Sequence, residues 1–411
     1  MAISEKFYLG RQPILDRRQE IVGYELLFRS AGLDYAEFDS YSHASASVIT
    51  NALAAFGIQE VLGGKLGFIN VHLGLLLSEM LELLPIDQSV LELLEIIKID
   101  DKVVERCREL KQLGFRLALD DHEYNPECVG IYEHVDIIKL DILQIPADLL
   151  PGIVGKLRQW PVKILAEKVE TVEQFEACFR MGFDMFQGYF FERPVILNKK
   201  RIDVSGMAML KLLQQLTRNA AIEEIEETFK ANPSMSYTLL RLVNSVAIGA
   251  RAKIKTLRHA ITMLGIDHIR RWIQLSLFAG NDSRGINNPL LEMAAVRGRL
   301  MEILVMQKER SPGVTEKSEE AFMTGILSLL EVLFETPMSE IVESLNLTDE
   351  VSNALLFRTG DLGQLLTLAE RLEVTDFNAV TPLLDQCEIT LDQLLAAQLD
   401  AFNWRVSVMA R

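Results

Sequence analysis

The first half of the sequence alternates between two kinds of segment, and this alternation constrains the fold more than any other feature. Short runs rich in β-branched and aromatic residues cover 115–121, 135–141 and 162–169, whereas 44–56 and 171–181 have the apolar spacing of amphipathic helices. Strands that alternate with helices pair in parallel. About eight such strands in fewer than 200 residues predict a compact α/β barrel, with an open doubly wound sheet as the alternative.

The first two predicted strands, 7–14 and 20–28, are an exception to this alternation. The short polar turn Asp16-Arg17-Arg18-Gln19 lies between them. Parallel neighbours need a crossover of a dozen or more residues, so this link is too short to hold one. The pair is therefore expected to form an antiparallel hairpin.

The second half of the sequence has a different pattern. Residues 197–204 form a polar connector, and beyond it segments of helical period dominate, with no β-hairpin signal. We therefore expect two domains, an α/β barrel over residues 1–196 and an all-α domain over residues 197–411.

The charge balance limits the classes of partner. The chain has 411 residues, with 58 Asp and Glu against 42 Lys and Arg, which gives a net charge of −16. A protein this acidic repels polyanions, so we expect no binding of duplex nucleic acid. It can still hold cations.

The cysteines and the apolar runs indicate the cellular compartment of the protein. The four cysteines are far apart in the sequence and form no C-x-x-C pair, which favours a reducing compartment over a disulfide framework or a structural zinc site. The richest apolar run, 73–84, is broken by Ser78, Glu79 and Glu82 and falls short of the roughly 20 apolar residues that span a bilayer. We expect a cytoplasmic protein without a membrane span.

Polar side chains recur near the C-terminal ends of the predicted strands, inside otherwise apolar runs. In a parallel barrel these ends converge on the face that carries the active site. A single acidic residue at a strand end is more often a helix cap or a turn former. Here the pattern extends over seven strands: Glu25, Asn70, Glu92, Glu95, Asp120, Asp121, Lys139, Asp141, Glu167 and Gln187.

Carboxylates gathered in this way need a positive partner, because they cannot all stay ionised in a low-dielectric site. Their oxygens suit Mg²⁺ or Mn²⁺, whereas His72 and His122 are the only histidines near these ends to suggest zinc. Two such ions about 4 Å apart would clamp a phosphodiester and acidify a bound water. Lys139 would then orient that water or neutralise charge on the reacting phosphate.

At these residues the sequence resembles the EAL family, the cyclic di-GMP phosphodiesterases of bacteria. Its E-x-L-x-R signature is matched by Glu25, Leu27 and Arg29. The remaining motifs follow in the family's order: Asn70, Glu92 with Glu95, Asp120 with Asp121, Lys139 with Asp141, Glu167 with Glu170, and Gln187 with Gly188. The resemblance covers residues 7–194 and implies a modified (β/α)₈ barrel, or TIM barrel, with an antiparallel first strand.

The resemblance also implies roles for these residues and a product, the linear diguanylate. Lys139 would hold or activate the attacking water, with Glu167 as the competing candidate for the base. Glu95 and Glu170 would support the loops of the site. Two sets would contact the ligands: Glu25, Asn70, Glu92, Asp120, Asp121 and Glu167 around the two metal ions, and Leu27, Arg29, Asp141 and Gln187 against cyclic di-GMP.

One loop departs from the family pattern. The family's glycine-containing segment after the Asp pair is replaced here by His122-Glu123-Tyr124-Asn125-Pro126. The resemblance implies that this loop helps to set the second metal ion and the dimer contact, so its change bears on turnover. A homodimer is among the assemblies that the resemblance implies. Two alternatives to the enzyme stay open: a catalytically silent cyclic di-GMP receptor, and a scaffold with neither activity.

The helical half resembles the HDOD domain, a relative of the HD phosphohydrolases. The resemblance lies in 232–245 and 254–258 and in Leu264-Gly265. None of the six histidines is followed by Asp, so the His-Asp pair of a true HD enzyme is missing from this sequence. The resemblance implies an output module that contacts a signalling protein, which the sequence does not identify.

Overall fold

The structure is a computed structural model of the 411-residue chain. The helix expected over 44–56 and most of the motif 232–245 lie outside the residues that the structure describes. The described residues are 7–30, 61–122, 124–190, 204–231, 235–236, 239, 257–280, 289–334, 336–345 and 347–409. They form two compact units, one of residues 1–193 with 368–411 and one of residues 194–367.

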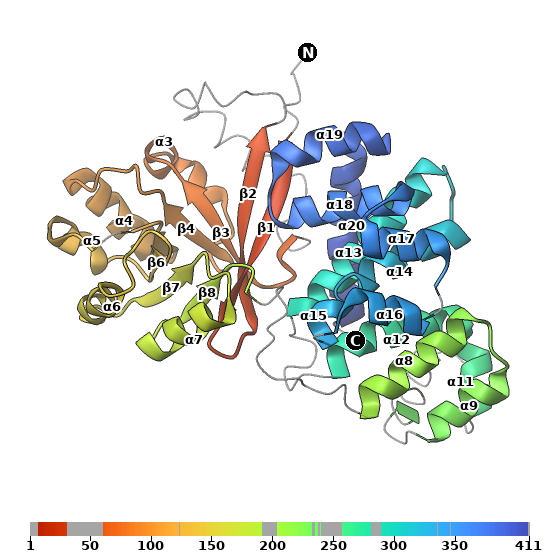
Figure 1. Ribbon diagram of the computed structural model, residues 1–411. Coiled ribbons are helices and arrows are strands. Elements are labelled where there is room, and N and C mark those ends of the chain that lie inside the picture. Colours follow the sequence, from red (N-terminus) through yellow and green to blue (C-terminus); the bar gives the residue numbers. More distant parts are fainter. Residues whose placement is uncertain are drawn as a thin grey trace, which may run out of the picture. The chain divides into compact units, whose positions relative to one another are not determined.

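The first unit contains a closed barrel of eight strands, ordered β1 to β8 around the ring (Figure 1). Strand β1 runs antiparallel to both of its neighbours, β2 and β8, and every other neighbouring pair is parallel. The barrel and its antiparallel first strand are therefore confirmed, and the open sheet is excluded. The strands are β1 (Phe7–Asp16), β2 (Ile21–Ser30), β3 (Leu66–Val71), β4 (Ser89–Leu93), β5 (Arg116–Leu119), β6 (Ile137–Asp141), β7 (Lys163–Glu167) and β8 (Met185–Gln187).

Helices connect the parallel strands and lie outside the barrel (Figure 1). Local sequence sets their ends: Asp100 caps the first of the longer ones, Thr171 and Gln174 form a capping box on the last, and Gly114 and Gly182 end these two helices with φ of 101° and 96°. The helical elements are α3 (Leu73–Leu76), η2 (Glu79–Leu83), α4 (Asp101–Leu113), η3 (Pro126–Cys128), α5 (Val129–Tyr132), α6 (Leu150–Leu157) and α7 (Val172–Met181).

One layer of buried apolar side chains fills the barrel interior. Seven strands contribute one residue each: Ile14, Phe68, Val90, Ala118, Ile137, Leu165 and Met185. Since side chains alternate between the two faces of a strand, a residue two positions from this layer also points into the barrel. Any site at the C-terminal ends of the strands therefore lies directly above this apolar layer.

The C-terminal helices α19 (Phe377–Cys387) and α20 (Leu391–Met409) pack against strand β1 in the same unit. The ring of Phe377 stacks on that of Tyr8 at 5.5 Å, and the Tyr8 hydroxyl lies 2.8 Å from Thr381 Oγ1. From α20, Gln398 Nε2 donates a buried hydrogen bond to the carbonyl oxygen of Leu9. Residues 368–411 thus group with the barrel, whereas the sequence expectation placed everything after residue 196 in the helical domain.

We expect Tyr8 and Thr381 to be energetically coupled. Because their hydroxyls are hydrogen-bonded across this contact, a double-mutant cycle with Tyr8→Phe and Thr381→Val should give a coupling energy of about 1 kcal/mol. The measurement is urea unfolding of the two single variants, the double variant and the wild type. Strictly additive effects would contradict the packing of α19 on β1.

Among the described residues of the second unit, every regular element is a helix, as expected. Its longest helix, α13 (Pro289–Lys308), packs on α14 (Glu316–Leu327) at two glycines, where a Cβ on Gly325 would lie 2.7 Å from Gly298 Cα. The other helices are α8 (Val204–Thr217), α9 (Ile222–Lys230), α11 (Leu257–Leu264), α12 (Ile266–Gly280), α15 (Leu330–Phe334), α16 (Met338–Leu345), α17 (Asp349–Phe357) and most of α18 (Gly360–Glu373).

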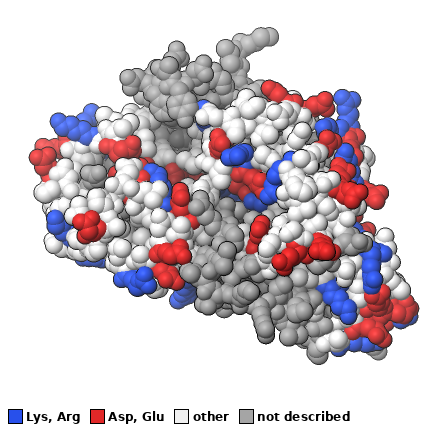
Figure 2. Space-filling model, in the orientation of Figure 1, with Lys and Arg blue, Asp and Glu red and all other residues white. Residues whose placement is uncertain are grey.

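Charge on the described surface is mixed. In the view of Figure 2, acidic and basic side chains are interspersed over both units, so the net charge of −16 is not concentrated in one acidic patch on that face. Among the helices that the structure describes, none has the length and the apolar character needed to cross a membrane.

Candidate active site

The polar residues that the sequence singled out lie one step above the apolar layer of the barrel. Asn70 follows Phe68 by two positions, and Glu92 and Lys139 follow Val90 and Ile137 in the same way. Glu25, Asp120, Glu167 and Gln187 have the same offset from the inward positions of their strands. The two-residue repeat of a strand, together with closure of the barrel, therefore brings side chains from seven strands to one place.

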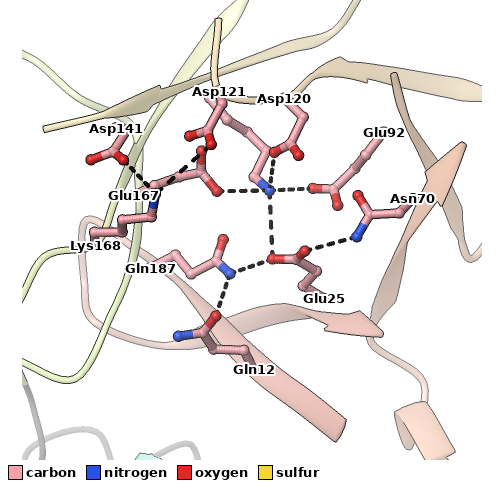
Figure 3. Close-up of polar contacts among 11 residues, drawn as sticks. Gln12, Glu25, Asn70, Glu92, Asp120, Asp121, Asp141, Glu167, Lys168 and Gln187 are labelled. Atoms are coloured by element: carbon pink, nitrogen blue, oxygen red, sulfur yellow. Dashed lines mark hydrogen bonds and ion pairs between the residues drawn. The ribbon is translucent and has the colours of Figure 1, made fainter. Parts of the chain in front are cut away.

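Lys139 lies at the centre of this group and is fully buried. Its ammonium nitrogen is 2.7 Å from Asp120 Oδ1, 2.8 Å from Glu167 Oε1, 2.9 Å from Glu92 Oε1 and 3.5 Å from Glu25 Oε2. Figure 3 shows these four carboxylates pointing toward a single nitrogen atom. One ammonium group thus faces carboxylates from four other strands.

Amide side chains fix the orientation of Glu25. Asn70 Nδ2 donates to Glu25 Oε1 at 3.1 Å, and Gln187 Nε2 donates to Glu25 Oε2 at 2.5 Å and to Gln12 Oε1 at 2.8 Å (Figure 3). Sequence reasoning missed Gln12. Two features of the sequence could have indicated Gln12: it is a polar residue inside the first apolar strand, and it pairs with Glu25 in the hairpin.

A second cationic side chain, also missed from the sequence, lies at the edge of the group. Lys168 directly follows β7, and its ammonium group forms an ion pair with Asp141 and lies 3.8 Å from Asp121 Oδ2 (Figure 3). Asp121 and Lys168 both have left-handed backbone conformations, with φ of 39° and 56°. A lysine next to a strand end gives no sequence signal for such a role, because most exposed lysines there are simply solvated.

Burial raises the pKa of three carboxyl groups at the site, those of Glu92, Asp120 and Glu167. Desolvation raises the pKa of Glu92 well above its usual value and raises the pKa of Asp120, although the charge of Lys139 opposes both shifts. Desolvation likewise raises the pKa of Glu167 to about 8, against the lowering effect of Lys139. A carboxyl group that titrates near neutral pH can exchange a proton during a reaction.

Glu25 and Lys139 shift in the direction that keeps them charged. Desolvation would raise the pKa of Glu25, but the charge of Lys139 and hydrogen bonds from Gln187 and Asn70 outweigh it and lower that pKa. Desolvation would lower the pKa of Lys139, but the surrounding carboxylates raise it well above its usual value. Lys139 therefore stays protonated at neutral pH and cannot serve as a base.

The donor set fits hard divalent cations. Several buried oxygens have no hydrogen-bond partner within the described part of the chain: Asn70 Oδ1, Glu92 Oε2, Asp121 Oδ1, Glu167 Oε2 and Gln187 Oε1. Unpaired buried acceptors of this kind are costly unless a cation or water satisfies them. Fully ionised, the six carboxylates (Glu25, Glu92, Asp120, Asp121, Asp141 and Glu167) and two ammonium groups would carry four negative charges, which two divalent ions would neutralise.

These side chains would have to rearrange to bind an ion. As they stand, no group of three acidic, histidine or cysteine side chains among the described residues is spaced to hold a metal. The ammonium of Lys139 occupies the space between the carboxylates. Metal binding at this site would therefore separate some of these carboxylates from Lys139.

The remaining predicted site residues lie around the group rather than in it. Arg29 Nη2 donates to Asn378 Oδ1 of α19 at 2.7 Å, and Leu27 lies two residues before it on β2. Glu95 is exposed beyond the end of β4. The backbone N–H of Glu170 donates to Gln174 Oε1 at the start of α7.

The divergent loop after β5 is held by its own contacts. His122 Nε2 lies 2.7 Å from the Tyr132 hydroxyl, and the backbone N–H of Asn125 donates to the same hydroxyl. Asn125 Oδ1 accepts from the N–H of Glu127 and caps η3. His72, the other histidine near the strand ends, caps α3 through Nδ1. Both histidines therefore have structural partners outside the carboxylate group.

Comparison with known sequences identifies two domain types in this chain. The profile of the EAL domain matches residues 73–194, and the profile of the HDOD domain matches residues 206–344. These matches agree with the two resemblances seen in the motifs.

Two relatives match nearly the whole length of the chain. "Uncharacterized protein YuxH" of Bacillus subtilis is 29% identical over 98% of this chain and 99% of its own length. "Cyclic di-GMP phosphodiesterase CdgJ" of Vibrio cholerae is 29% identical over 97% of this chain and 92% of its own. Among solved structures, the Bacillus subtilis YkuI protein, with an EAL domain and in complex with c-di-GMP and calcium, aligns over 63% of this chain and 73% of its own, with 19% identity and a TM-score of 0.39.

Proposed function

Because this chain joins an EAL domain to an HDOD domain, we propose that its barrel binds cyclic di-GMP and hydrolyses one phosphodiester bond to give the linear dinucleotide. The observation that carries the proposal is the convergence of Glu25, Glu92, Asp120 and Glu167 on Lys139 at the C-terminal ends of the strands. The full-length similarity to a cyclic di-GMP phosphodiesterase supports it.

Two divalent ions, Mg²⁺ or Mn²⁺, would be held by Glu25, Asn70, Glu92, Asp120, Asp121 and Glu167. When bound, such ions polarise the phosphate and acidify a water molecule. The fit rests on the oxygen-only donor set and on its unpaired buried oxygens.

Two side chains, Lys139 and Glu167, would orient the attacking water and accept its proton. Lys139, which stays protonated, would donate a hydrogen bond to the attacking water and hold it in line. Glu167 in its ionised form would accept the proton from that water, because Lys139, the other candidate, stays protonated and has no lone pair to accept it. As the water oxygen bonds to phosphorus, the opposite P–O bond breaks and the leaving sugar oxygen takes a proton from solvent water, while Glu167 returns the proton that it accepted to solvent.

The substrate contacts follow from charge and hydrogen-bonding capacity. Arg29 would pair with a phosphate of the dinucleotide, since a guanidinium matches phosphate geometry. Asp141 offers a carboxylate to the N–H donors of a guanine base, Gln187 offers an amide, and Leu27 offers an apolar contact.

We also propose that the HDOD unit transmits the state of the barrel to a signalling protein, and that the chain can form a homodimer. The proposed place of action is the cytoplasm, in keeping with the scattered cysteines.

A turnover assay tests the proposed activity. The full chain, given cyclic di-GMP and Mn²⁺, should form the linear dinucleotide, and Glu25→Gln should lower the rate at least tenfold, or by about 1.4 kcal/mol in transition-state stabilisation. Glu173→Gln, at an exposed position in α7, is the matched control and should keep the wild-type rate. Equal rates in the two variants would contradict the proposed site.

A catalytically silent receptor is the second candidate, and a specific contact favours it. Lys168 lies beside Asp121, one of the residues expected to hold the second ion. If that ion binds too weakly, ligand binding would survive and hydrolysis would fail. Tight binding of cyclic di-GMP without product, measured by calorimetry on the same protein, would identify the receptor.

A further inference from the structure

Lys168 has a backbone conformation that lysine rarely adopts. It follows Glu167 at the end of β7 with φ of 56°, in the left-handed region that glycine occupies without penalty. A side chain in this region is disfavoured, because its Cβ crowds the following carbonyl oxygen. Strained positions of this kind cluster at functional sites, where the surrounding structure holds them in place.

This conformation directs the lysine side chain over the carboxylate group. Its ammonium pairs with Asp141 of β6 and lies 3.8 Å from Oδ2 of Asp121, which follows β5 (Figure 3). Asp121 is also left-handed, and its Oδ1 is buried without a hydrogen-bond partner in the described residues. One oxygen of Asp121 thus faces a fixed positive charge, and the other is free to accept a cation.

A divalent ion bound to Asp121 would share that carboxylate with the ammonium of Lys168. Like charges a few ångströms apart repel, and the repulsion is stronger in a partly buried site than in water. The lysine side chain is about half exposed, at 49%, so solvent weakens this effect but does not remove it. Lys139 does not impose the same penalty on Asp121, because its close partners are four different carboxylates, those of Glu25, Glu92, Asp120 and Glu167.

We propose that Lys168 is a built-in cation that weakens binding of the divalent ion next to Asp121, so that the site holds one ion tightly and the second weakly. The inference rests on the proposed function, because it takes Asp121 as a metal ligand. Lys168 is then a positioning residue, and it sets the concentration of metal at which both divalent ions are bound.

The charge on Lys168 is permanent under ordinary conditions. Burial would lower its pKa, but the hydrogen bond to Asp141 and the charges of Asp121 and Glu167 outweigh that effect and raise it.

Titration of the metal-free full chain with Mn²⁺ tests the inference. Calorimetry, with free Mn²⁺ followed by electron paramagnetic resonance, gives the number of ions and their dissociation constants without any turnover. We expect one tight and one weak ion in the wild type, and Lys168→Met should lower the dissociation constant of the weak ion about tenfold. Lys168→Arg, which keeps the charge, should retain the weak ion.

Two further variants guard against indirect effects. Lys163→Met removes an exposed lysine at the opposite end of the same strand and should match the wild type. Lys168→Gly removes the charge and also favours the left-handed backbone, so it folds at least as well and should tighten the second ion as Lys168→Met does.

Two results would overturn the inference in distinguishable ways. If Mn²⁺ binds but Lys168→Met and Lys168→Gly leave the weak ion unchanged or weaker, the inference fails and the proposed function stands. If no variant and no wild-type protein binds Mn²⁺, the metal site of the proposed function fails as well, and Lys168 has no ion to act on.

Discussion

Replacing Lys139 by methionine is expected to lower the free energy of unfolding of the metal-free protein by about 3–5 kcal/mol near neutral pH. The side chain is fully buried, and its nitrogen lies within 3.5 Å of an oxygen from each of four carboxylates. Methionine has a similar volume but no charge, so these carboxylates would be left buried without their cation. Breaking a buried ion cluster costs more than any single surface pair can contribute.

Urea unfolding followed by circular dichroism measures this loss, and hydrogen exchange of β6 and β7 assigns it to the barrel. Lys163→Met, at the exposed start of β7, is the matched control and should stay within about 0.5 kcal/mol of the wild type. The same Lys139 variant should form no linear dinucleotide, because it loses the ammonium group that lies between the four carboxylates and would hold the attacking water. Equal stability of the two lysine variants would show that Lys139 does not neutralise the carboxylates.

Most of the candidate site could be predicted because a strand has a short repeat. A charged residue such as Glu92 or Lys139, inside a run of Leu and Ile, stands out against the buried surroundings that the run implies. Once the strands are known to close into a parallel barrel, their C-terminal ends must meet. Two pieces of local information, polarity and strand direction, therefore locate side chains that are far apart in the sequence.

Gln12 was missed because its strand runs the other way. In β1 the site residue precedes the apolar layer residue, Ile14, by two positions instead of following it. The parallel strands contribute site residues from their C-terminal ends, whereas the antiparallel strand β1 contributes from its N-terminal side. The hairpin was predicted, so the same register argument could have identified Gln12.

The role of Lys168 and the packing of the C-terminal helices could not be predicted from local sequence, for a different reason. The sign of φ at a non-glycine residue is set by tertiary structure, and the lysine itself carries no signal of it. The amphipathic pattern of 391–405 shows that a face is buried but not which surface covers it. That helix packs with the barrel, through contacts such as Gln398 to Leu9, which are 389 positions apart in the sequence.

The stability of the metal-free protein is expected to fall as the pH rises toward 8. Glu167 has a usual pKa of 4.5 and a folded-state pKa of about 8, so between these values the folded protein holds a proton that the unfolded chain releases. This contribution is complete below pH 4.5 and is lost as the pH rises, by up to about 5 kcal/mol in total. Glu92 and Asp120, whose pKa values are also raised, act in the same direction.

His122 opposes this loss of stability in the lower part of the interval from pH 4.5 to 8. Burial lowers the pKa of His122 from 6.5 to about 4, so protonation of the unfolded chain favours unfolding below pH 6.5. Above pH 6.5 that effect is absent, and the carboxyl groups act alone. The clear test is therefore the interval from pH 6.5 to 8, where we expect a loss of about 2 kcal/mol from Glu167.

Urea unfolding at a series of pH values, with and without Mn²⁺, separates the metal-free site from the filled one. Glu167→Gln removes the titrating group and should flatten most of the slope between pH 6.5 and 8, whereas Glu173→Gln should leave it as in the wild type. Mn²⁺ binds the ionised carboxylates, so at saturating metal the stability should rise with pH instead of falling. A slope that Mn²⁺ does not change would mean that the titrating carboxyls are not those that hold the metal. In that case the buried cluster would be a structural ion network around Lys139, and the phosphodiester chemistry would have to lie elsewhere.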